Sequence, residues 1–365
     1  MFLSCFRGLH GLFSGVAMNY YRTVTFQPPT ETLTNFPVLV RIQNDRMRSR
    51  ILSPYGWDVC FELDGTRLPF ELDWYDAGSG SGAWWVQMPT LSSSAPTSIK
   101  MLYGDSSITT NQSDPNTVWA DYYLVYHFAD TANIRSSVGS FTATLNEGTR
   151  TWDGISLVSN AITGRAMQFK MNGGQYTQDS AIIRLCDAVS DIREGGMTLL
   201  ATDCIAYNSQ YGFWMSSMDS YFNYALKGNA VTLRGGNQTP TISPDSTTTA
   251  GGHYNFACYG VDTTYGTCQG LVANGASQSC SGSSYVTLKY GLYFYGTGRS
   301  STYPTRFGFD ECRISKVSHG LAWLLYEQKN AIEHATCTAY SGEFYADGTP
   351  MNSFKPWIFS TQCLD

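Results

Sequence analysis

Two acidic residues in one short stretch could form a catalytic carboxylate pair. The run from Cys60 to Tyr75 reads CFELDGTRLPFELDWY, so Phe-Glu-Leu-Asp occurs twice and supplies Glu62 and Glu71. Such carboxyl groups would act as general acid and base on a glycosidic bond if they stood roughly 5–9.5 Å apart. The alternative is that both lie on the polar edge of a β-hairpin.

The Asp64-Gly65 dipeptide inside this stretch is a strong signal for a tight two-residue turn. The turn predicts these cross-strand pairs: Leu63 with Thr66, Glu62 with Arg67, Phe61 with Leu68, Val59 with Phe70, Asp58 with Glu71 and Trp57 with Leu72. In this register Glu62 and Glu71 stand about 13 Å apart along the ribbon, too far for a glycosidase pair. The sequence therefore favours a hairpin with a Glu62–Arg67 ion pair, and it leaves the like charges of Asp58 and Glu71 unexplained.

A second acidic pair, Asp310-Glu311, lies in the other half of the chain. Adjacent residues of a strand point to opposite faces, so these two are not expected to act on one sugar. No Gly-x-Ser-x-Gly, His-Glu-x-x-His or Gly-x-x-x-x-Gly-Lys-Ser/Thr motif occurs. The chain is therefore predicted not to be an enzyme and to have no catalytic residue, with a glycoside hydrolase as the most distant interpretation.

The sequence predicts neither a metal site nor a cofactor. The 10 cysteines include no Cys-x-x-Cys pair. His127, in an apolar strand, is typical of a core histidine rather than a ligand. A calcium ion is the alternative, because Asp130, Asp179 and Asp187 lie near predicted loops, although no EF-hand spacing supports it.

Exposed aromatic side chains could bind sugars as flat platforms beside amide and carboxylate groups. The candidates lie in Gly- and Asn-rich surroundings in the second half of the chain: Trp152, Tyr176, Trp214, Tyr221 and Tyr224. A β-sandwich also needs aromatic side chains in its core, so a core role is the alternative for each of them.

The elements that must position all these residues are β-strands. Charged residues make up 14% of the chain, which has 24 Tyr and 35 Gly, and Ser/Thr-rich segments separate short apolar runs. This composition is typical of an all-β protein with many turns. The net charge of -6 includes no Lys/Arg cluster, so nucleic acid is not an expected partner. No apolar run reaches about 18 residues, so no membrane span is predicted.

The first half carries an ordered set of motifs that resembles a domain of unknown function found in bacterial surface proteins. The family pattern matches at Gly56, Asp58, Phe61, Asp64, Gly65, Leu68, Pro69, Glu71, Trp85, Val86, Pro89, Leu91, Tyr103 and Gly104. That domain typically precedes a concanavalin A-like, laminin-G-like domain. In agreement, residues 162–169 and 309–330 resemble the first strand and the last strand and closing helix of the lectin-like partner, with departures at Cys312, at His319-Gly320 and in residues 130–139.

The resemblance and the strand pattern together predict an all-β fold. A small β-sandwich domain is followed by a concanavalin A-like jelly-roll sandwich, with one short C-terminal helix and terminal arms. The predicted domains are an N-terminal arm (1–19), the small β domain of the unknown-function family (20–117), the lectin-like domain (118–335) and a C-terminal aromatic tail (336–365).

The two terminal segments are rich in apolar side chains that are costly to leave in water. We expect each to pack on its own fold or to dock into a neighbouring subunit. The candidate assembly contacts are Phe2, Phe6, Leu9, Phe13, Phe354, Trp357 and Phe359.

These observations leave two hypotheses for function. The favoured one is a non-catalytic structural component of an extracellular or virion surface assembly, with other copies or neighbouring subunits as partners. The alternative is a monomeric attachment module that binds glycans. The sequons at Asn111 and Asn237 and the even cysteine count suit such an exterior setting, and Cys258, Cys268 and Cys280 are where a disulfide is expected.

Overall fold

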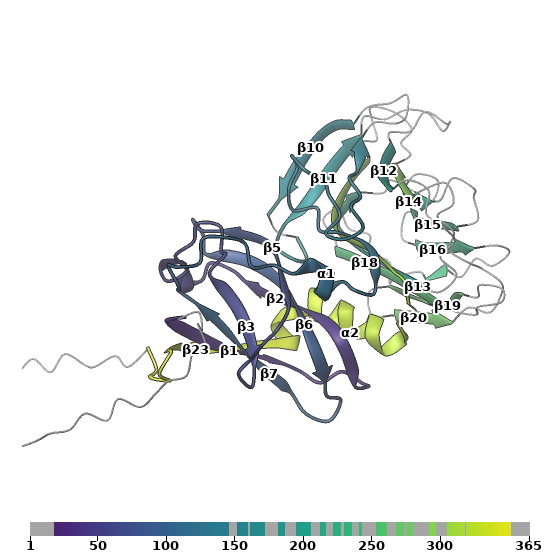
Figure 1. The fold of residues 1–365 in the computed structure, drawn as a ribbon. Helices are drawn as coiled ribbons and strands as arrows, with labels where there is room; N and C mark the ends of the chain where they lie inside the picture. The colour runs from purple at the N-terminus through teal and green to yellow at the C-terminus, as the bar shows by residue number, and fades with distance from the viewer. Residues whose placement is uncertain are drawn as a thin grey trace, which may run out of the picture.

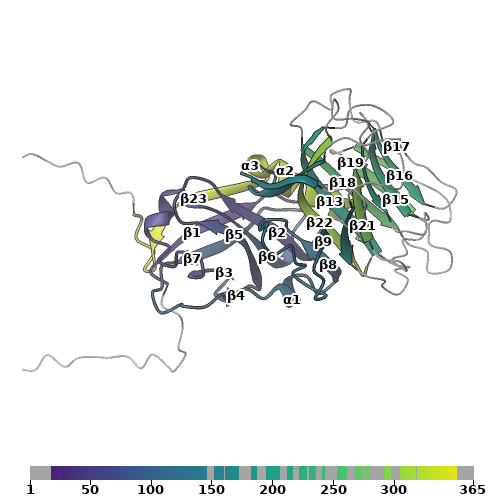
Figure 2. The same ribbon diagram turned by 90° about the horizontal axis from the view of Figure 1, so that it is seen from above.

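The structure is a computed structural model of the 365-residue chain. It describes residues 18–145, 152–159, 161–171, 182–186, 195–205, 212–216, 222–227, 230–235, 241–242, 253–260, 268–273, 276–279, 292–296, 305–317 and 319–351. Side chains are described for residues 18–145, 154–159, 161–169, 183–186, 308–317 and 319–351. Within these ranges the chain forms two β-sandwich units that lie side by side (Figures 1 and 2).

The first unit packs a five-stranded sheet, in the order β23-β1-β7-β3-β4, against a three-stranded sheet, β2-β6-β5. Its strands are β1 (Tyr20–Phe26), β2 (Leu33–Ile42), β3 (Val59–Leu63), β4 (Thr66–Arg67), β5 (Phe70–Asp76), β6 (Ser81–Leu91), β7 (Thr97–Tyr103) and β23 (Thr338–Tyr345), with a 3-10 turn, η1 (Arg46–Ser49). Val24, Phe61, Trp84 and Val86 are among the buried side chains that fill the space between the two sheets. Alternation along these strands supplies this apolar face.

The predicted Asp64-Gly65 turn is confirmed. Both residues have positive φ, at 50° and 81°, as a tight hairpin turn requires. Glu62 pairs with Arg67 across the hairpin, and their side chains form an ion pair at 3.1 Å. The hairpin is shorter than predicted, because β3 continues along β7 while β5 joins β6 in the other sheet.

The predicted pairs Val59 with Phe70 and Trp57 with Leu72 are therefore wrong. The proline at position 69 cannot donate to a ladder, and at this point the chain crosses from one sheet to the other. The crossing also separates Asp58 from Glu71, which explains why two like charges at these positions are tolerated.

The second unit has an eight-stranded and a seven-stranded sheet. The first follows the order β10-β11-β22-β13-β18-β19-β20 with β8 also paired to β22, and the second the order β17-β16-β15-β14-β21-β12-β9. The strands are β8 (Tyr122–Tyr126), β9 (Thr144–Leu145), β10 (Trp152–Val158), β11 (Ala166–Met171), β12 (Ile182–Cys186), β13 (Gly195–Ile205), β14 (Gly212–Ser216), β15 (Phe222–Lys227), β16 (Ala230–Gly235), β17 (Thr241–Ile242), β18 (His253–Gly260), β19 (Cys268–Ala273), β20 (Ala276–Ser279), β21 (Leu292–Gly296) and β22 (Thr305–Ser315). The predicted all-β class is confirmed.

Three helices accompany the sheets in the described part of the chain: α1 (Pro115–Val118), α2 (Leu321–Ile332) and α3 (His334–Cys337). Helix α2 lies at the boundary of the two units (Figures 1 and 2). Trp323 of α2 packs on Phe36 of β2, with ring centroids 4.5 Å apart, and belongs to the core of the first unit. After α2 the chain returns to the first unit as β23, which pairs with β1 along its length.

The predicted division at residues 19/20, 117/118 and 335/336 stays a prediction for independent folding units. The packing of the last elements is seen directly. The first part of the predicted aromatic tail lies on the first unit, where Phe344 stacks on Tyr21 with ring centroids 5.1 Å apart. Among the described residues, no helix has both the length and the hydrophobicity of a membrane-spanning segment.

The three-stranded sheet is buried on both faces. One face belongs to the core of the first unit, and the other carries Leu39, Trp74 and Trp85 against α1, β8 and the loop after β10. Alternate residues of one strand therefore serve two different cores, as Trp84 and Trp85 of β6 do. This second face positions the polar residues described next.

Candidate functional site

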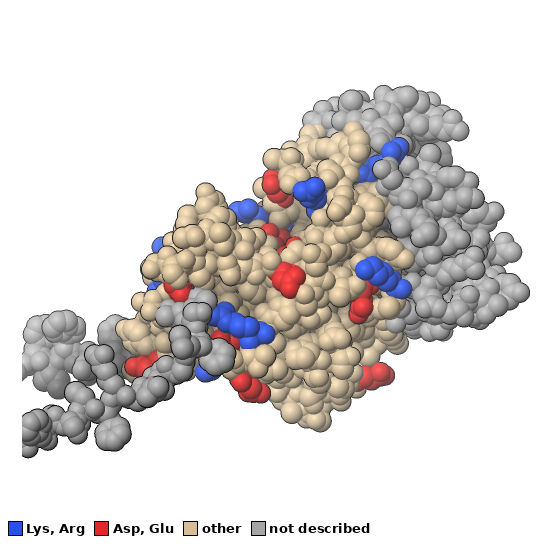
Figure 3. All heavy atoms as spheres, in the orientation of Figure 1, with Lys and Arg blue, Asp and Glu red and all other residues tan. Residues whose placement is uncertain are grey.

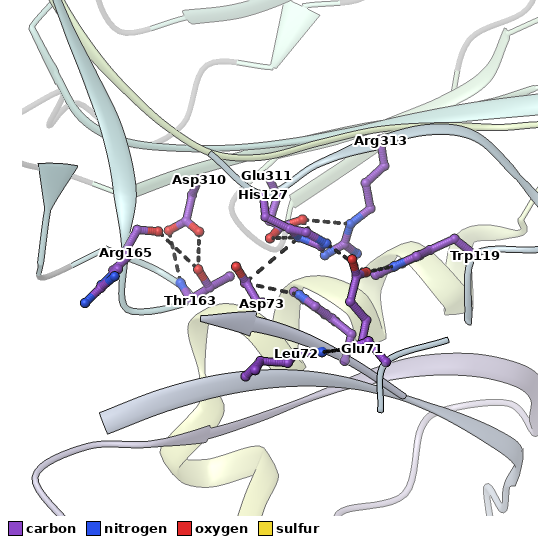
Figure 4. Close-up of polar contacts among 12 residues, drawn as sticks. Glu71, Leu72, Asp73, Trp119, His127, Thr163, Arg165, Asp310, Glu311 and Arg313 are labelled. Carbon is purple, nitrogen blue, oxygen red and sulfur yellow. Dashed lines mark hydrogen bonds and ion pairs between the residues drawn. The ribbon is translucent and has the colours of Figure 1, made fainter. Parts of the chain in front are cut away.

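A group of charged side chains is buried where the two units meet. We call it the buried charged cluster. It consists of Glu71 and Asp73 of β5, His127 after β8, Glu311 and Arg313 of β22 and Glu327 of α2, together with the indoles of Trp85 and Trp119. Figure 4 shows Glu71, Asp73, His127, Glu311 and Arg313 converging from both units.

Two β-bulges aim the acidic side chains of this cluster. In β5, Asp73 falls between the pairs Leu72–Trp84 and Trp74–Ala83 and has no cross-strand partner. A bulge adds one residue to a strand and re-aims its side chain. Asp73 is therefore able to join Glu71 on the face that meets the second unit.

The second bulge lies in β22, where Asp310 falls between the pairs Leu200–Glu311 and Ala201–Phe309. Asp310 and Glu311 both extend from β22 toward the first unit (Figure 4). The expectation that these neighbours point to opposite faces is therefore wrong, because the bulge interrupts the alternation of the strand.

His127 lies between carboxylates from both units. Its Nδ1–H donates to Glu311 at 2.7 Å and its Nε2–H donates to Glu71 at 3.0 Å, while Asp73 lies 3.9 Å from Nδ1. Burial alone would lower the pKa of His127, but the charges of Glu311, Asp73 and Glu71 hold that pKa well above its ordinary value. His127 is thus an imidazolium at neutral pH. The prediction of a buried, hydrogen-bonded histidine is confirmed.

Glu71 and Asp73 respond to the same environment in opposite ways. Burial would raise the pKa of Glu71, but His127 and hydrogen bonds from His127, Ser137 and Trp119 lower it overall. Burial raises the pKa of Asp73 well above its ordinary value, and Glu311 and Glu71 add to this effect while His127 opposes it. The same buried surroundings therefore shift the pKa values of Asp73 and Glu71 in opposite directions.

Each of the three guanidinium nitrogens of the buried Arg313 donates a hydrogen bond to a glutamate. Its Nε and Nη2 donate to Glu311 at 3.1 and 2.9 Å, and its Nη1 donates to Glu327 at 2.6 Å. The guanidinium lies 4.0 Å from the ring centroid of Trp85 and 4.6 Å from that of Trp119. Burial works against the charge of Arg313, but the two glutamates raise its pKa overall. Charge-assisted hydrogen bonds and two neighbouring indole rings thus surround the guanidinium.

Asp310 is held by the loop that precedes β11. Its carboxylate accepts hydrogen bonds from the backbone N–H of Thr163, at 3.0 Å, and from the Thr163 hydroxyl. Burial and the neighbouring Glu311 raise the pKa of Asp310 to about 7. The buried charged cluster therefore continues as far as this loop (Figure 4).

The buried charged cluster joins the two units and is closed to dissolved molecules. The side chains of Asp73, Glu311 and Arg313 have no exposed surface, and that of His127 is 10% exposed. The residue types in the cluster suit charge pairing, retention of a proton and ligation of a small ion.

A second candidate site lies open on the surface of the first unit. It is a pocket of about 270 Å³, lined by Leu52, Ser53, Pro54, Tyr55, Trp57, Asp105, Ser106, Ile108 and Thr109. The ring of Tyr55 is stacked with that of Trp57 at 4.7 Å, and Tyr55 is 61% exposed. We call it the Tyr55 pocket.

The segment that lines the Tyr55 pocket is held in place by the side chain of Asp58. The carboxylate of Asp58, which is fully buried, accepts hydrogen bonds from the backbone N–H groups of Leu52 at 2.7 Å and Ser53 at 3.0 Å. Gly56 has a φ of 73°, and a Cβ there would lie 2.7 Å from the ring of Tyr75. Glycine is therefore required at the turn that carries Tyr55.

The predicted sugar-binding and assembly residues remain predictions. Trp152, Trp214 and Tyr224 fall in β10, β14 and β15, where side chains are not among those described. The following residues lie outside the described residues: Tyr176, Tyr221, Phe2, Phe6, Leu9, Phe13, Phe354, Trp357 and Phe359. Of the proposed calcium ligands, Asp130 is exposed and bonds to the backbone of Ala132, while Asp179 and Asp187 lie outside the described residues.

The Tyr55 pocket was not predicted from the sequence, although Ser53-Pro54-Tyr55-Gly56-Trp57 does place two aromatic residues within a turn signal. Three cysteines, at positions 60, 312 and 337, are free and buried. The predicted bridge among Cys258, Cys268 and Cys280 falls where side chains are not described. On the face drawn in Figure 3, acidic and basic side chains are scattered over the described surface without a basic patch.

The sheets thus define an all-β protein of two β-sandwich units joined through a buried charged cluster. Residues 56–152 match the model of DUF2341, a domain of unknown function. A match of this segment to a domain of unknown function was predicted from its motifs and is confirmed. No curated protein matches the chain.

Similar solved structures include two binding domains and one domain of an arabinanase. The binding domain of Paraclostridial Mosquitocidal Protein 1 is 11% identical, with a TM-score of 0.42, over 57% of this chain and 51% of that one. A second similar structure is Domain 4 of AbnA, a GH43 extracellular arabinanase from Geobacillus stearothermophilus, solved in complex with arabinotriose. It is 16% identical, with a TM-score of 0.41, over 57% of this chain and 98% of that one. The botulinum neurotoxin serotype D binding domain is 12% identical, with a TM-score of 0.38, over 56% of this chain and 50% of that one. This chain thus covers about half the length of each of the two binding domains. These sequence identities are too low to assign the ligand of any of the three structures to this chain.

Proposed function

We propose that this chain is a non-catalytic recognition module of an extracellular or virion surface assembly, and that its first unit binds glycans in the Tyr55 pocket. The observation that carries the proposal is the stacking of the exposed Tyr55 on the half-buried Trp57 in an open pocket. The buried charged cluster supports a non-catalytic function, because its carboxylates cannot reach a dissolved substrate in this conformation.

The lining of the Tyr55 pocket suits a sugar ring. Pyranose rings have one face of C–H groups, which packs on aromatic rings, and a rim of hydroxyls, which needs a few polar partners. Tyr55 and Trp57 supply the flat surface, and the exposed Ser106 and Thr109 supply hydroxyls beside it. The wall is fixed by Asp58, so little ordering is required on binding.

A glycan array with the full chain, followed by titration calorimetry, tests this proposal. We expect Tyr55→Ala and Trp57→Ala to weaken the binding of the best glycan at least tenfold without a change in the circular dichroism spectrum. The matched control is Tyr345→Ala, which removes an exposed aromatic ring outside the pocket. The proposal fails if no glycan binds, or if the two pocket variants bind as the control does.

Assembly is supported by a separate observation. Strands β1 and β23 are antiparallel neighbours in which Tyr20 faces Tyr345, so the apolar segments 1–17 and 352–365 are attached at one end of the same sheet. Two segments that start together can act on one neighbouring subunit. We expect the full chain to associate in light scattering and a chain of residues 18–351 to be monomeric. A monomeric full chain that binds glycans would favour the attachment module.

A further inference from the structure

Three side chains of the buried charged cluster each direct one ligand atom to the same place. Nδ1 of His127, a carboxylate oxygen of Asp73 and a carboxylate oxygen of Glu311 all lie within 4.8 Å of one another. Figure 4 shows Asp73 rising from the first unit toward His127, and Glu311 descending from β22 to meet it. Imidazole nitrogen and carboxylate oxygen both bind zinc, and three protein ligands are the number found in catalytic zinc sites.

An independent observation is the unmet bonding capacity of Asp73. Its side chain has no exposed surface, and its Oδ1 has no hydrogen-bond partner among the described residues. Its other oxygen receives only a long hydrogen bond, 3.4 Å, from the indole N–H of Trp85. Buried carboxyl oxygens are nearly always bonded, so a carboxyl group left open inside a cluster indicates a missing cation or donor.

The outer contacts that a metal site needs are already in place. Nε2–H of His127 donates to Glu71 at 3.0 Å, which leaves Nδ1 as the nitrogen that can bind an ion. Glu71 in turn accepts a hydrogen bond from the indole N–H of Trp119. Both guanidinium contacts to Glu311 are made to Oε2, so that Oε1 stays on the side of His127.

We propose that Asp73, His127 and Glu311 bind one divalent transition-metal ion between the two units, with Zn²⁺ as the test ion. The ion takes the place of the proton between His127 and Glu311, which leaves to solvent. Tetrahedral coordination with metal–ligand distances of about 2.0–2.2 Å requires these two atoms, now 2.7 Å apart, to separate by about 0.6–0.9 Å. The imidazole ligand favours Zn²⁺ over Ca²⁺ and Mg²⁺.

The test is equilibrium dialysis of the chelator-treated full chain against Zn²⁺, with elemental analysis, alongside the variants Asp73→Asn and Asp310→Asn. Asp73→Asn keeps the size and shape of the side chain and removes the negative charge of one ligand. Asp310→Asn is the matched control, because it removes a neighbouring buried carboxylate whose contacts are to Thr163. We expect one tightly bound Zn²⁺ per wild-type chain, at least tenfold weaker binding by Asp73→Asn, and wild-type stoichiometry in Asp310→Asn.

X-ray absorption of the wild-type zinc complex decides the matter without any variant. A first shell of nitrogen and oxygen at about 2.0–2.2 Å, with the outer scattering of one imidazole, supports the proposal. A sulfur shell at about 2.3 Å would place the ion on cysteines and overturn it. The absence of bound zinc, or unchanged affinity in a folded Asp73→Asn chain, would overturn it as well.

Discussion

Arg313 is the charge on which the contact between the two units depends. It has no exposed surface, it donates hydrogen bonds to Glu311 and Glu327, and its guanidinium lies close to the rings of Trp85 and Trp119. Taking an ion out of water is costly, and the surrounding contacts offset that cost only as a complete set. Loss of one member leaves the others buried without a counter-charge.

Arg313→Gln is therefore expected to destabilise the protein by about 3–5 kcal/mol, because Glu327 would lose the buried charge that pairs with it and Glu311 would keep only His127. Arg67→Gln is the matched control: Arg67 also pairs with a glutamate, Glu62, but its side chain is 41% exposed. An exposed pair contributes about 0–1 kcal/mol. Urea unfolding curves measure both, and equal losses would contradict the importance given to burial.

His334 predicts a dependence of stability on pH. Burial and the nearby charge of Arg41 lower the pKa of His334 to about 4, and its ring bonds to the Asn330 carbonyl at 3.1 Å and to the Tyr340 hydroxyl at 2.9 Å. The unfolded chain takes up a proton near pH 6.5 and the folded chain only near pH 4. Stability is thus full above about pH 6.5 and falls as the pH drops toward 4.

This group should make the wild type about 2 kcal/mol less stable at pH 5 than at pH 7. His334→Gln keeps a side chain that can donate to Asn330 and removes the titration. Urea unfolding at the two pH values is the measurement. An unchanged pH dependence in the variant would show that other groups, such as His319, account for the effect.

Several single residues were predictable from the sequence because their partners are near in the chain. The Glu62–Arg67 pair follows from the Asp64-Gly65 turn alone. The buried charged cluster was not predictable in this way. Asp73 joins it through a bulge, which a strict alternation of strand residues does not contain. Its partners, His127 and Glu311, come from distant parts of the sequence.

At the scale of elements, the loop before β11 connects the two units. Thr163 of this loop binds Asp310, and the carbonyl of Ile162 accepts a hydrogen bond from Arg41 of β2. Gly164 follows with a φ of 114°, and a Cβ there would lie 2.4 Å from the ring of Trp74. The close packing of this loop on β5 therefore depends on glycine.

Gly164→Ala is expected to destabilise the protein by about 2–4 kcal/mol, from a strained φ and from displacement of Trp74. Gly342→Ala in β23 is the control, since its Cβ would meet nothing within 4 Å. Thermal unfolding followed by circular dichroism compares the two. Similar melting temperatures would mean that the loop can move away from Trp74 at little cost.

The elements themselves were predicted better than their connections. Apolar alternation and turn signals predicted an all-β chain and one clear C-terminal helix, and both are found. The assignment of β3 and β5 to different sheets was not predicted, because the hairpin rule describes only the residues next to a turn. The return of β23 to β1 depends on contacts that no local pattern records.

At the scale of the whole molecule, the two units share too much buried structure to unfold independently. Helix α2 contributes Trp323 to the core of the first unit and Glu327 to the buried charged cluster. Asn330 of α2 also accepts a hydrogen bond from the backbone of Leu39 at 2.6 Å. If the second unit unfolded, α2 would lose its contacts there and would no longer support the first unit.

Differential scanning calorimetry of the full chain should accordingly show one cooperative transition. Arg313→Gln, which weakens the contact between the units, should lower the midpoint and broaden the peak or divide it. Two well-separated peaks in the wild type would contradict the shared core as the determinant of unfolding.

The pairing of β1 with β23 has a mechanical consequence. Tyr20 and Tyr345, at the outer end of this ladder, are direct partners. A tensile load applied at residues 18 and 351 would act across the hydrogen bonds at that end and would open them one pair after another, because these bonds run perpendicular to the strands. The load would separate β23 from β1 before it acted on the rest of the molecule. The remaining sheets would therefore bear no load until β23 had detached.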